Sequence, residues 1–155
     1  MSLKKAISFT IVILALISCD TEDVRLTLVE DAIKTVKREE FFSKRAILII
    51  PNGGCDGCIT AVEQFVTDNL QQYPELLVVF TSTQSQKSLR LRMGDFIYNH
   101  KNVFIDKNNH FYTKELISEY PTIVYIENRK PTKVQYQSPE EPIALETLQV
   151  YLDSE

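Results

Sequence analysis

The sequence predicts an α/β fold, a three-layer α/β/α sandwich with a mixed central sheet. Two apolar runs, at residues 46–50 and 76–80, are typical of strands buried on both faces, as in sheets with helices on both sides. Apolar residues recur at helical spacing after each run, so strands and helices alternate and the early strands are expected to be parallel. Residues 122–127 and 133–137 flank a turn and predict an antiparallel hairpin. The length of 155 residues, with 44% hydrophobic and 25% charged residues, suits one globular domain.

The N-terminal residues predict a targeting segment that precedes the fold. Lys4 and Lys5 are followed by an apolar run at 6–17, which is shorter than the roughly 20 residues that a membrane-spanning helix needs. This run ends in Leu16-Ile17-Ser18-Cys19, which resembles the lipobox of bacterial lipoproteins, where the cysteine becomes lipidated. The resemblance implies a signal peptide at 1–18, an acyl anchor on Cys19 and an extracytoplasmic place in the bacterial cell envelope. A plain secretory signal with an incidental cysteine is the alternative.

Residues 19–39 are expected to hold the lipidated cysteine, a tether and the start of the first helix, and the folded domain is expected to cover 40–155. The alternation of apolar and polar residues at 24–28 predicts a short edge strand or part of the tether. The apolar spacing across 31–42 predicts a surface helix.

The remaining elements follow in chain order. In the first half we expect a strand at 46–50, a helix over 59–70, a strand at 76–80, a helical face at 89–97 and a strand at 103–105. In the second half we expect one or two helical turns at 112–119, strands at 122–127 and 133–137 around a turn at 128–131, and a helix over 143–152. Pro142 lies near the first turn of that last helix, where proline is tolerated.

The chemistry is predicted at the motif Cys55-Asp56-Gly57-Cys58, which lies between a buried strand and the first turn of a helix. Unpaired N–H groups and the helix dipole at this position stabilise a thiolate, which lowers the pKa of Cys55. Cys58, one turn further along, can attack a mixed disulfide on Cys55 and release the partner. The spacing therefore predicts thiol–disulfide exchange, with Cys55 as the attacking thiol and Cys58 as the resolving thiol.

Over residues 40–153 the chain resembles the thioredoxin superfamily, and within it the membrane-anchored thioredoxin-like proteins of the bacterial envelope. The features that match are the strands at 46–50 and 76–80, the cysteine motif, and Tyr120-Pro121-Thr122 before a late strand. The resemblance implies a thioredoxin-like sandwich and a thiol–disulfide oxidoreductase that acts on envelope proteins and is recycled by a redox partner, without a cofactor. It also implies that Pro121 is cis and shapes the substrate groove beside the cysteines, with Tyr120 as the adjacent backbone contact.

The motif departs from the family pattern in three ways. Gly54, rather than Trp, precedes the first cysteine, and Asp56-Gly57 stands where Gly-Pro or Pro-His is common. The strand at 46–50 has no acidic residue that could assist the resolving thiol. Asp56 adds negative charge beside Cys55, which would raise the pKa of that thiol and favour a reducing or weakly reactive couple over a strongly oxidising one.

Other functions stay open at this point. A structural zinc site usually has four ligands, and only His100 and His110 could complete the cysteine pair, so no resident metal is expected. The copper-delivering Sco family uses two cysteines and a distant histidine, and His110 precedes Pro121, but the cysteines of that family are four positions apart rather than three. A binding lipoprotein with an inert Cys55–Cys58 disulfide is a third possibility. The net charge of −4, without basic clusters, argues against a nucleic-acid partner.

Overall fold

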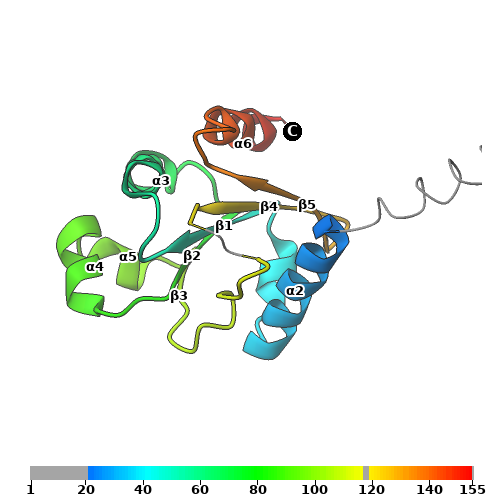
Figure 1. Cartoon of the computed structure of the whole chain (residues 1–155), viewed down its shortest axis with the longest axis horizontal. Coiled ribbons are helices and arrows are strands. Elements are labelled where there is room, and N and C mark those ends of the chain that lie inside the picture. Colours follow the sequence, from blue (N-terminus) through cyan, green and yellow to red (C-terminus); the bar gives the residue numbers. More distant parts are fainter. Residues whose placement is uncertain (1–20, 117–118, 155) are drawn as a thin grey trace, which may run out of the picture.

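A computed structural model describes residues 21–116 and 119–154 of the chain. It has the predicted α/β architecture, a five-stranded mixed sheet with helices on both sides, which is compatible with a thioredoxin-like sandwich (Figure 1). The strands lie side by side in the order β3-β2-β1-β4-β5. Their bounds are β1 Ala46–Pro51, β2 Leu76–Thr81, β3 Val103–Ile105, β4 Thr122–Glu127 and β5 Lys130–Tyr136.

The centre of the sheet confirms the two buried runs. β1 pairs in parallel with β2 and antiparallel with β4, and β2 pairs in parallel with β3. Every residue of β1 and β2 is buried. Because successive side chains point to opposite faces, Leu48 and Ile50 enter one core while Ile47 and Ile49 enter the other.

One face of the sheet carries α3 Asp56–Asn69, α4 Gln86–Met93, α5 Phe96–Asn99 and α6 Ala144–Asp153. Figure 1 shows α3 and α6 on this side and α2 on the other. The predicted helices over 59–70 and 143–152 are confirmed as α3 and α6. The helical face predicted at 89–97 is divided between α4 and α5, because Gly94 leaves the helical region with φ +83°.

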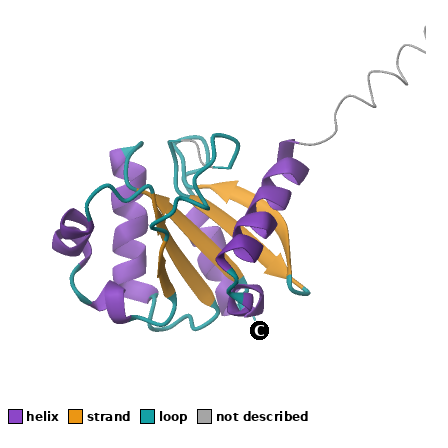
Figure 2. Cartoon of the chain, turned by 90° about the horizontal axis from the view of Figure 1, so that it is seen from below, coloured by secondary structure: helices purple, strands orange, loops and turns teal. Residues whose placement is uncertain are grey.

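The opposite face carries α2 Thr21–Val36, the short 3-10 helix η1 Glu39–Ser43 and the loop at 106–116. Figure 2 shows α2 lying across the strands. Val29, Ala32 and Ile33 are buried on the side of α2 that faces the sheet, together with Phe41 from η1 and Phe111 from the loop. This second core is built by the N-terminal segment and the loop that follows β3.

The N-terminal elements differ from the prediction. The prediction of an edge strand or tether at 24–28 is wrong, because these residues lie inside α2. A pattern of five residues is too short to distinguish a strand from a helix whose apolar side packs against a sheet. The helix expected over 31–42 ends at Val36, since Lys37 has φ +55° and a 3-10 turn follows. Cys19 and the expected signal peptide lie outside the described residues. None of the helices in residues 21–116 and 119–154 combines the length and the hydropathy that a membrane-spanning helix needs.

The C-terminal half confirms the hairpin and corrects the segment before it. β4 and β5 pair antiparallel, but the turn is only Asn128-Arg129, both with positive φ, and β5 begins earlier than expected, at Lys130. The helical turns expected at 112–119 are absent from the described part of that segment, residues 112–116 and 119. Leu116 of this segment is buried in the second core.

Candidate redox site

The two cysteines lie where the sequence placed them, at the junction of β1 and α3, and they form a disulfide. Their Cα atoms are 5.3 Å apart. Cys55 is the N-cap residue of α3: its carbonyl accepts a hydrogen bond from Ile59 N–H (2.9 Å), and its Sγ accepts one from Cys58 N–H (3.3 Å). The backbone thus directs a donor at the sulfur of Cys55, as an N-cap does for an oxygen acceptor.

The two sulfur-bearing residues differ in exposure. Cys55 is partly exposed, whereas Cys58, in the first turn of α3, is only 8% exposed. Asp56 and Gly57, which separate them, are exposed in the first turn of α3. Among the described residues the Asp56 carboxylate has no hydrogen bond or ion pair. A partner can therefore reach Cys55 from solvent, while Cys58 is shielded.

A second segment, residues 119–121, packs directly against the cysteine loop. The carbonyl of Glu119 accepts a hydrogen bond of 2.8 Å from Cys55 N–H. Gly54 has φ +139°, and a Cβ on it would overlap the carbonyl oxygen of Glu119 and lie 2.8 and 2.9 Å from its carbonyl carbon and Cα. Tyr120 is partly buried and Pro121 is buried, so the segment forms a backbone wall beside Cys55.

The Tyr120–Pro121 bond differs from what the resemblance implies. No peptide bond between described residues is cis, so this bond is trans. X–Pro bonds favour trans by about 0.5–1 kcal/mol unless the surroundings select cis. Pro121 nevertheless lies at the expected place, directly before β4, and its carbonyl accepts a hydrogen bond of 3.0 Å from Gln137 N–H, which follows β5.

The chain that leads to this wall is held by a buried carboxylate. Asp106, only 1% exposed, accepts hydrogen bonds from the hydroxyl of Thr81 (2.8 Å) and from the backbone N–H groups of His110 (3.0 Å) and Phe111 (2.8 Å). Thr81 ends β2 and Asp106 follows β3, so these bonds tie the loop at 106–111 to the sheet edge where Cys55 follows β1.

Tyr136 supports the same segment from β5. Its hydroxyl donates to the carbonyl of Leu116 at 3.2 Å. Burial raises the pKa of this phenol, and Glu141 adds to the rise while Arg25 opposes it. The hydroxyl therefore stays protonated at neutral pH and remains a hydrogen-bond donor. Arg25 of α2 lies over the Tyr136 ring and donates to the carbonyl of Glu115, so α2 also contacts this part of the loop.

A small hollow of about 170 Å³ lies beside the cysteine loop. It is lined by Asn52, Asp56, Ile59, Thr60, Glu63 and Arg92. Arg92 of α4 pairs with the Glu63 carboxylate of α3 at 3.0 Å, which joins the two helices on this side of the motif. The hollow gives the surface next to Asp56 a polar lining.

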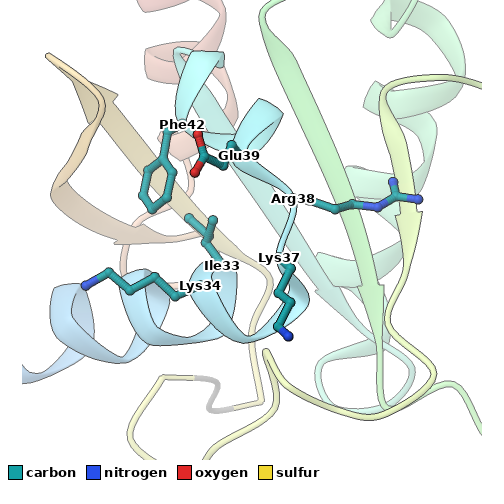
Figure 3. A pocket seen from close by; sticks show the side chains of 6 residues that line it. All are labelled: Ile33, Lys34, Lys37, Arg38, Glu39 and Phe42. Atoms are coloured by element: carbon teal, nitrogen blue, oxygen red, sulfur yellow. The ribbon is translucent and has the colours of Figure 1, made fainter.

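A second hollow, of about 230 Å³, lies where α2 meets η1 (Figure 3). It is lined by Ile33, Lys34, Lys37, Arg38, Glu39 and Phe42. It is at the opposite end of β1 from the cysteines, because η1 precedes β1 and Cys55 follows it. In Figure 3 the amino groups of Lys34 and Lys37 and the guanidinium of Arg38 point in different directions, so they do not converge on one anion.

The histidines occupy different ends of β3. His100 precedes the strand, its Nδ1 accepts a hydrogen bond from Asn102 N–H (3.2 Å), and burial together with Lys101 and Lys44 lowers its pKa. His110 follows the strand in the loop held by Asp106. In the part of the chain that the structure describes, no three His, Cys, Asp or Glu side chains gather closely enough to hold a metal ion.

Sequence reasoning missed three residues that shape this site: Gly54, Glu119 and Asp106. The Gly53-Gly54 pair offered a signal, since glycines at the end of a buried strand indicate unusual backbone geometry or a close approach of another chain segment. Nothing in the local sequence connects Glu119 or Asp106 to the cysteines, because both reach the site through tertiary packing.

The structure thus combines a disulfide at a helix N-terminus, a partly exposed Cys55 and a backbone wall beside this residue. These parts come from the loop after β1 and from the segment before β4, which are far apart in the sequence. Comparison of the chain with protein-family models, with curated proteins and with solved structures finds no match.

Proposed function

We propose that this protein is a thiol–disulfide oxidoreductase that exchanges disulfides with other proteins of the bacterial envelope. The observation that carries the proposal is the difference between the two cysteines of the Cys55–Cys58 disulfide: Cys55 is partly exposed and its Sγ accepts a backbone N–H at the start of α3, whereas Cys58 is buried. A cysteine pair that exchanges disulfides needs this difference, because the substrate protein must reach the first cysteine while the second stays close enough to attack the mixed disulfide.

The reaction proceeds through one mixed disulfide. In the reduced protein, the Cys55 thiolate attacks one sulfur of a substrate disulfide, forms a mixed disulfide and releases the other substrate sulfur as a thiolate. The Cys58 thiolate then attacks Sγ of Cys55 and displaces the remaining substrate sulfur. The substrate disulfide becomes two thiols and the protein dithiol becomes a disulfide, so a dithiol partner must return the electrons before the next turnover. Run in reverse, the same steps oxidise a substrate dithiol.

The protein supplies three aids to these steps. The N–H of Cys58 is placed to donate to the Cys55 thiolate, which favours the charged form of that sulfur. The N-terminus of α3 adds its partial positive charge at the same place. The wall at 119–121 offers a surface along which a substrate chain can lie beside Cys55.

The envelope location depends on the lipobox at 16–19. A lipid on Cys19 would hold the domain at a membrane, facing the periplasm or the cell surface, within reach of envelope proteins. Cys19→Ser is expected to move the protein from the membrane fraction to the soluble fraction of cells. Retention of the C19S protein in membranes would contradict lipid anchoring at this residue.

Trapping separates exchange from an inert structural bridge. In a chain of residues 20–155, Cys58→Ala should accumulate mixed disulfides through Cys55 with envelope proteins, because no resolving thiol is left to release them. Cys55→Ala is the matched control and should trap far less, since its remaining sulfur is shielded. If C58A traps nothing, the pair is inert and the protein is a binding lipoprotein with a structural disulfide.

A redox titration of the same chain in glutathione buffers gives a second test. A reversible two-electron transition between about −120 and −270 mV, the span of known exchange proteins, supports the proposed function. A disulfide that resists reduction until below about −300 mV contradicts it.

A further inference from the structure

We propose, on the basis of the exchange function above, that Gly54 is a positioning residue: because it has no side chain, residues 119–121 can lie against Cys55 and form the wall that a protein substrate contacts.

The first evidence is the close approach of two backbones. An ideal Cβ on Gly54 would overlap the carbonyl oxygen of Glu119 and come within 2.8 and 2.9 Å of its carbonyl carbon and Cα. All three atoms belong to the backbone, so no side-chain rotation could relieve the overlap. The next residue, Cys55, donates its N–H to the same carbonyl at 2.8 Å. The close approach to Gly54 and the hydrogen bond from Cys55 therefore both require the backbone of Glu119 to stay where it is.

The second observation is that residues 119–121 are also fixed at their C-terminal end, away from Gly54. The carbonyl of Pro121 accepts a hydrogen bond from Gln137 N–H at 3.0 Å, and β4 begins at the next residue. Gly54 itself has φ +139°, a conformation that glycine adopts freely and other L-residues rarely adopt. A methyl group on residue 54 must therefore move Glu119 away or rotate the backbone before Cys55, and either change breaks the hydrogen bond between them.

This loss should affect large and small substrates differently. A protein disulfide must lie along the wall while its sulfur aligns with Sγ of Cys55, so displacement of the wall misaligns the reacting atoms. A small disulfide needs access only to the sulfur, and its exchange rate follows the thiolate rather than the wall.

Gly53 provides a matched control one position earlier. A Cβ built on Gly53 meets no atom within 4 Å, and its φ lies outside the left-handed region. Gly53→Ala therefore makes the same chemical change in the same loop without touching Glu119.

The experiment compares wild-type, G54A and G53A proteins, each as the chain of residues 20–155, in two reactions. The first is reduction of insulin with dithiothreitol as the recycling reductant, and the second is reduction of the neutral bis(hydroxyethyl) disulfide. G54A should slow insulin reduction at least about tenfold, whereas its reaction with the small disulfide stays within about twofold, since a displacement of about 1 Å can cost up to about 100-fold in an aligned reaction. G53A should match the wild type in both reactions.

A second measurement does not depend on the folding of G54A. In the oxidised wild-type protein, the amide hydrogen of Cys55 should exchange with solvent at least about tenfold more slowly than in an unstructured peptide, because it is bonded to Glu119. An unprotected Cys55 amide overturns the inference. So does a folded G54A protein that reduces insulin at the wild-type rate or that loses both reactions equally. Wild-type protein that is inactive in both reactions instead contradicts the exchange function itself.

Discussion

At the residue scale, the same amino acid has two different surroundings three positions apart. Cys55 caps α3, is partly exposed and accepts a backbone N–H, while Cys58 is shielded inside the first turn. Neither difference is a property of cysteine itself. Both follow from the direction in which a helix begins, because its first N–H groups point back towards the N-cap residue.

Asp56 is expected to disfavour the thiolate form of Cys55 and so to raise the pKa of that thiol. In a chain of residues 20–155 that carries Cys58→Ala, Cys55 is the only thiol. Asp56→Asn should then lower the pKa of that thiol, because it removes an exposed negative charge from the adjacent residue. The pH dependence of alkylation by iodoacetamide measures this pKa. Asp68→Asn, the same change near the other end of α3, should leave the profile in place; equal profiles for all three proteins would show that Asp56 does not tune Cys55.

Asp106 is expected to stabilise the fold far more than an exposed carboxylate does. Asp106→Ala removes three hydrogen bonds to a buried charged group and should lower the free energy of unfolding by about 3 kcal/mol. Asp95 pairs with Arg90 at 2.8 Å, but both side chains are exposed, so Asp95→Ala should cost less than about 1 kcal/mol. Denaturation in urea measures both values. Similar losses in the two variants would mean that Asp106 does not hold the loop.

At the element scale, the hairpin between β4 and β5 shows how a turn is selected. The sequence marks Asn128-Arg129-Lys130-Pro131 as a turn, and the structure uses only the first two residues, with φ +50° and +64°. Positive φ at both central residues matches the right-handed twist of the paired strands. Asn tolerates this conformation, whereas Arg adopts it at a cost.

Arg129→Gly is therefore expected to stabilise the protein by roughly 1 kcal/mol, because it relieves the left-handed backbone and creates the Asn-Gly pair that such turns favour. Among the residues that the structure describes, the only partner of the Arg129 side chain is Glu39 at 3.8 Å, and both side chains are exposed, so loss of that pair should change stability little. Arg129→Ala loses the same pair but keeps the backbone strain, and it should bring no gain. Thermal or urea unfolding compares them; equal stability of the glycine and alanine variants would contradict the strain.

At the scale of the whole molecule, the central strands join two cores into one unit. β1 and β2 contribute alternate residues to the core beneath α3 and α6 and to the core beneath α2. If the helices on one face unfolded, they would expose apolar side chains of β1 and β2, the same strands on which the other helix layer packs. The N-terminal helix is therefore part of the packed domain, and the wall at 119–121 rests on a loop that packs in the α2 layer.

Substitutions on opposite faces should accordingly shift one common transition. Ile33→Ala in α2 and Leu148→Ala in α6 remove fully buried side chains and should each cost about 2–5 kcal/mol. Urea unfolding followed by circular dichroism should show a single transition with a lower midpoint and an unchanged slope in each variant. Val24, in the same helix as Ile33, is 50% exposed, so Val24→Ala should cost less than about 0.5 kcal/mol. If I33A does not shift the midpoint, α2 unfolds independently of the sheet.

Four features could be predicted from the amino-acid sequence: the central strands, the helices α3 and α6, the hairpin, and the position of the cysteine motif between a strand and a helix. These features depend on local patterns. A strand that is buried on both faces shows an uninterrupted apolar run, and a helix that is buried on one side shows apolar residues at helical spacing. The cysteine motif lies between a pattern of each kind. Expectations that concern exchange, the lipid anchor and the roles of Cys55, Cys58 and Pro121 remain predictions for the experiments above.

The contacts between these elements became known only from the folded structure. The helical state of residues 24–28 depends on a sheet face that α2 covers, and no five-residue pattern contains that face. The contact of Gly54 with Glu119, the trans bond before Pro121 and the bonds of Asp106 likewise join segments that are distant in the chain. The spacing of apolar residues along the chain shows which side chains share one face of a helix or strand. Which other element packs against that face depends on the packing of the whole domain.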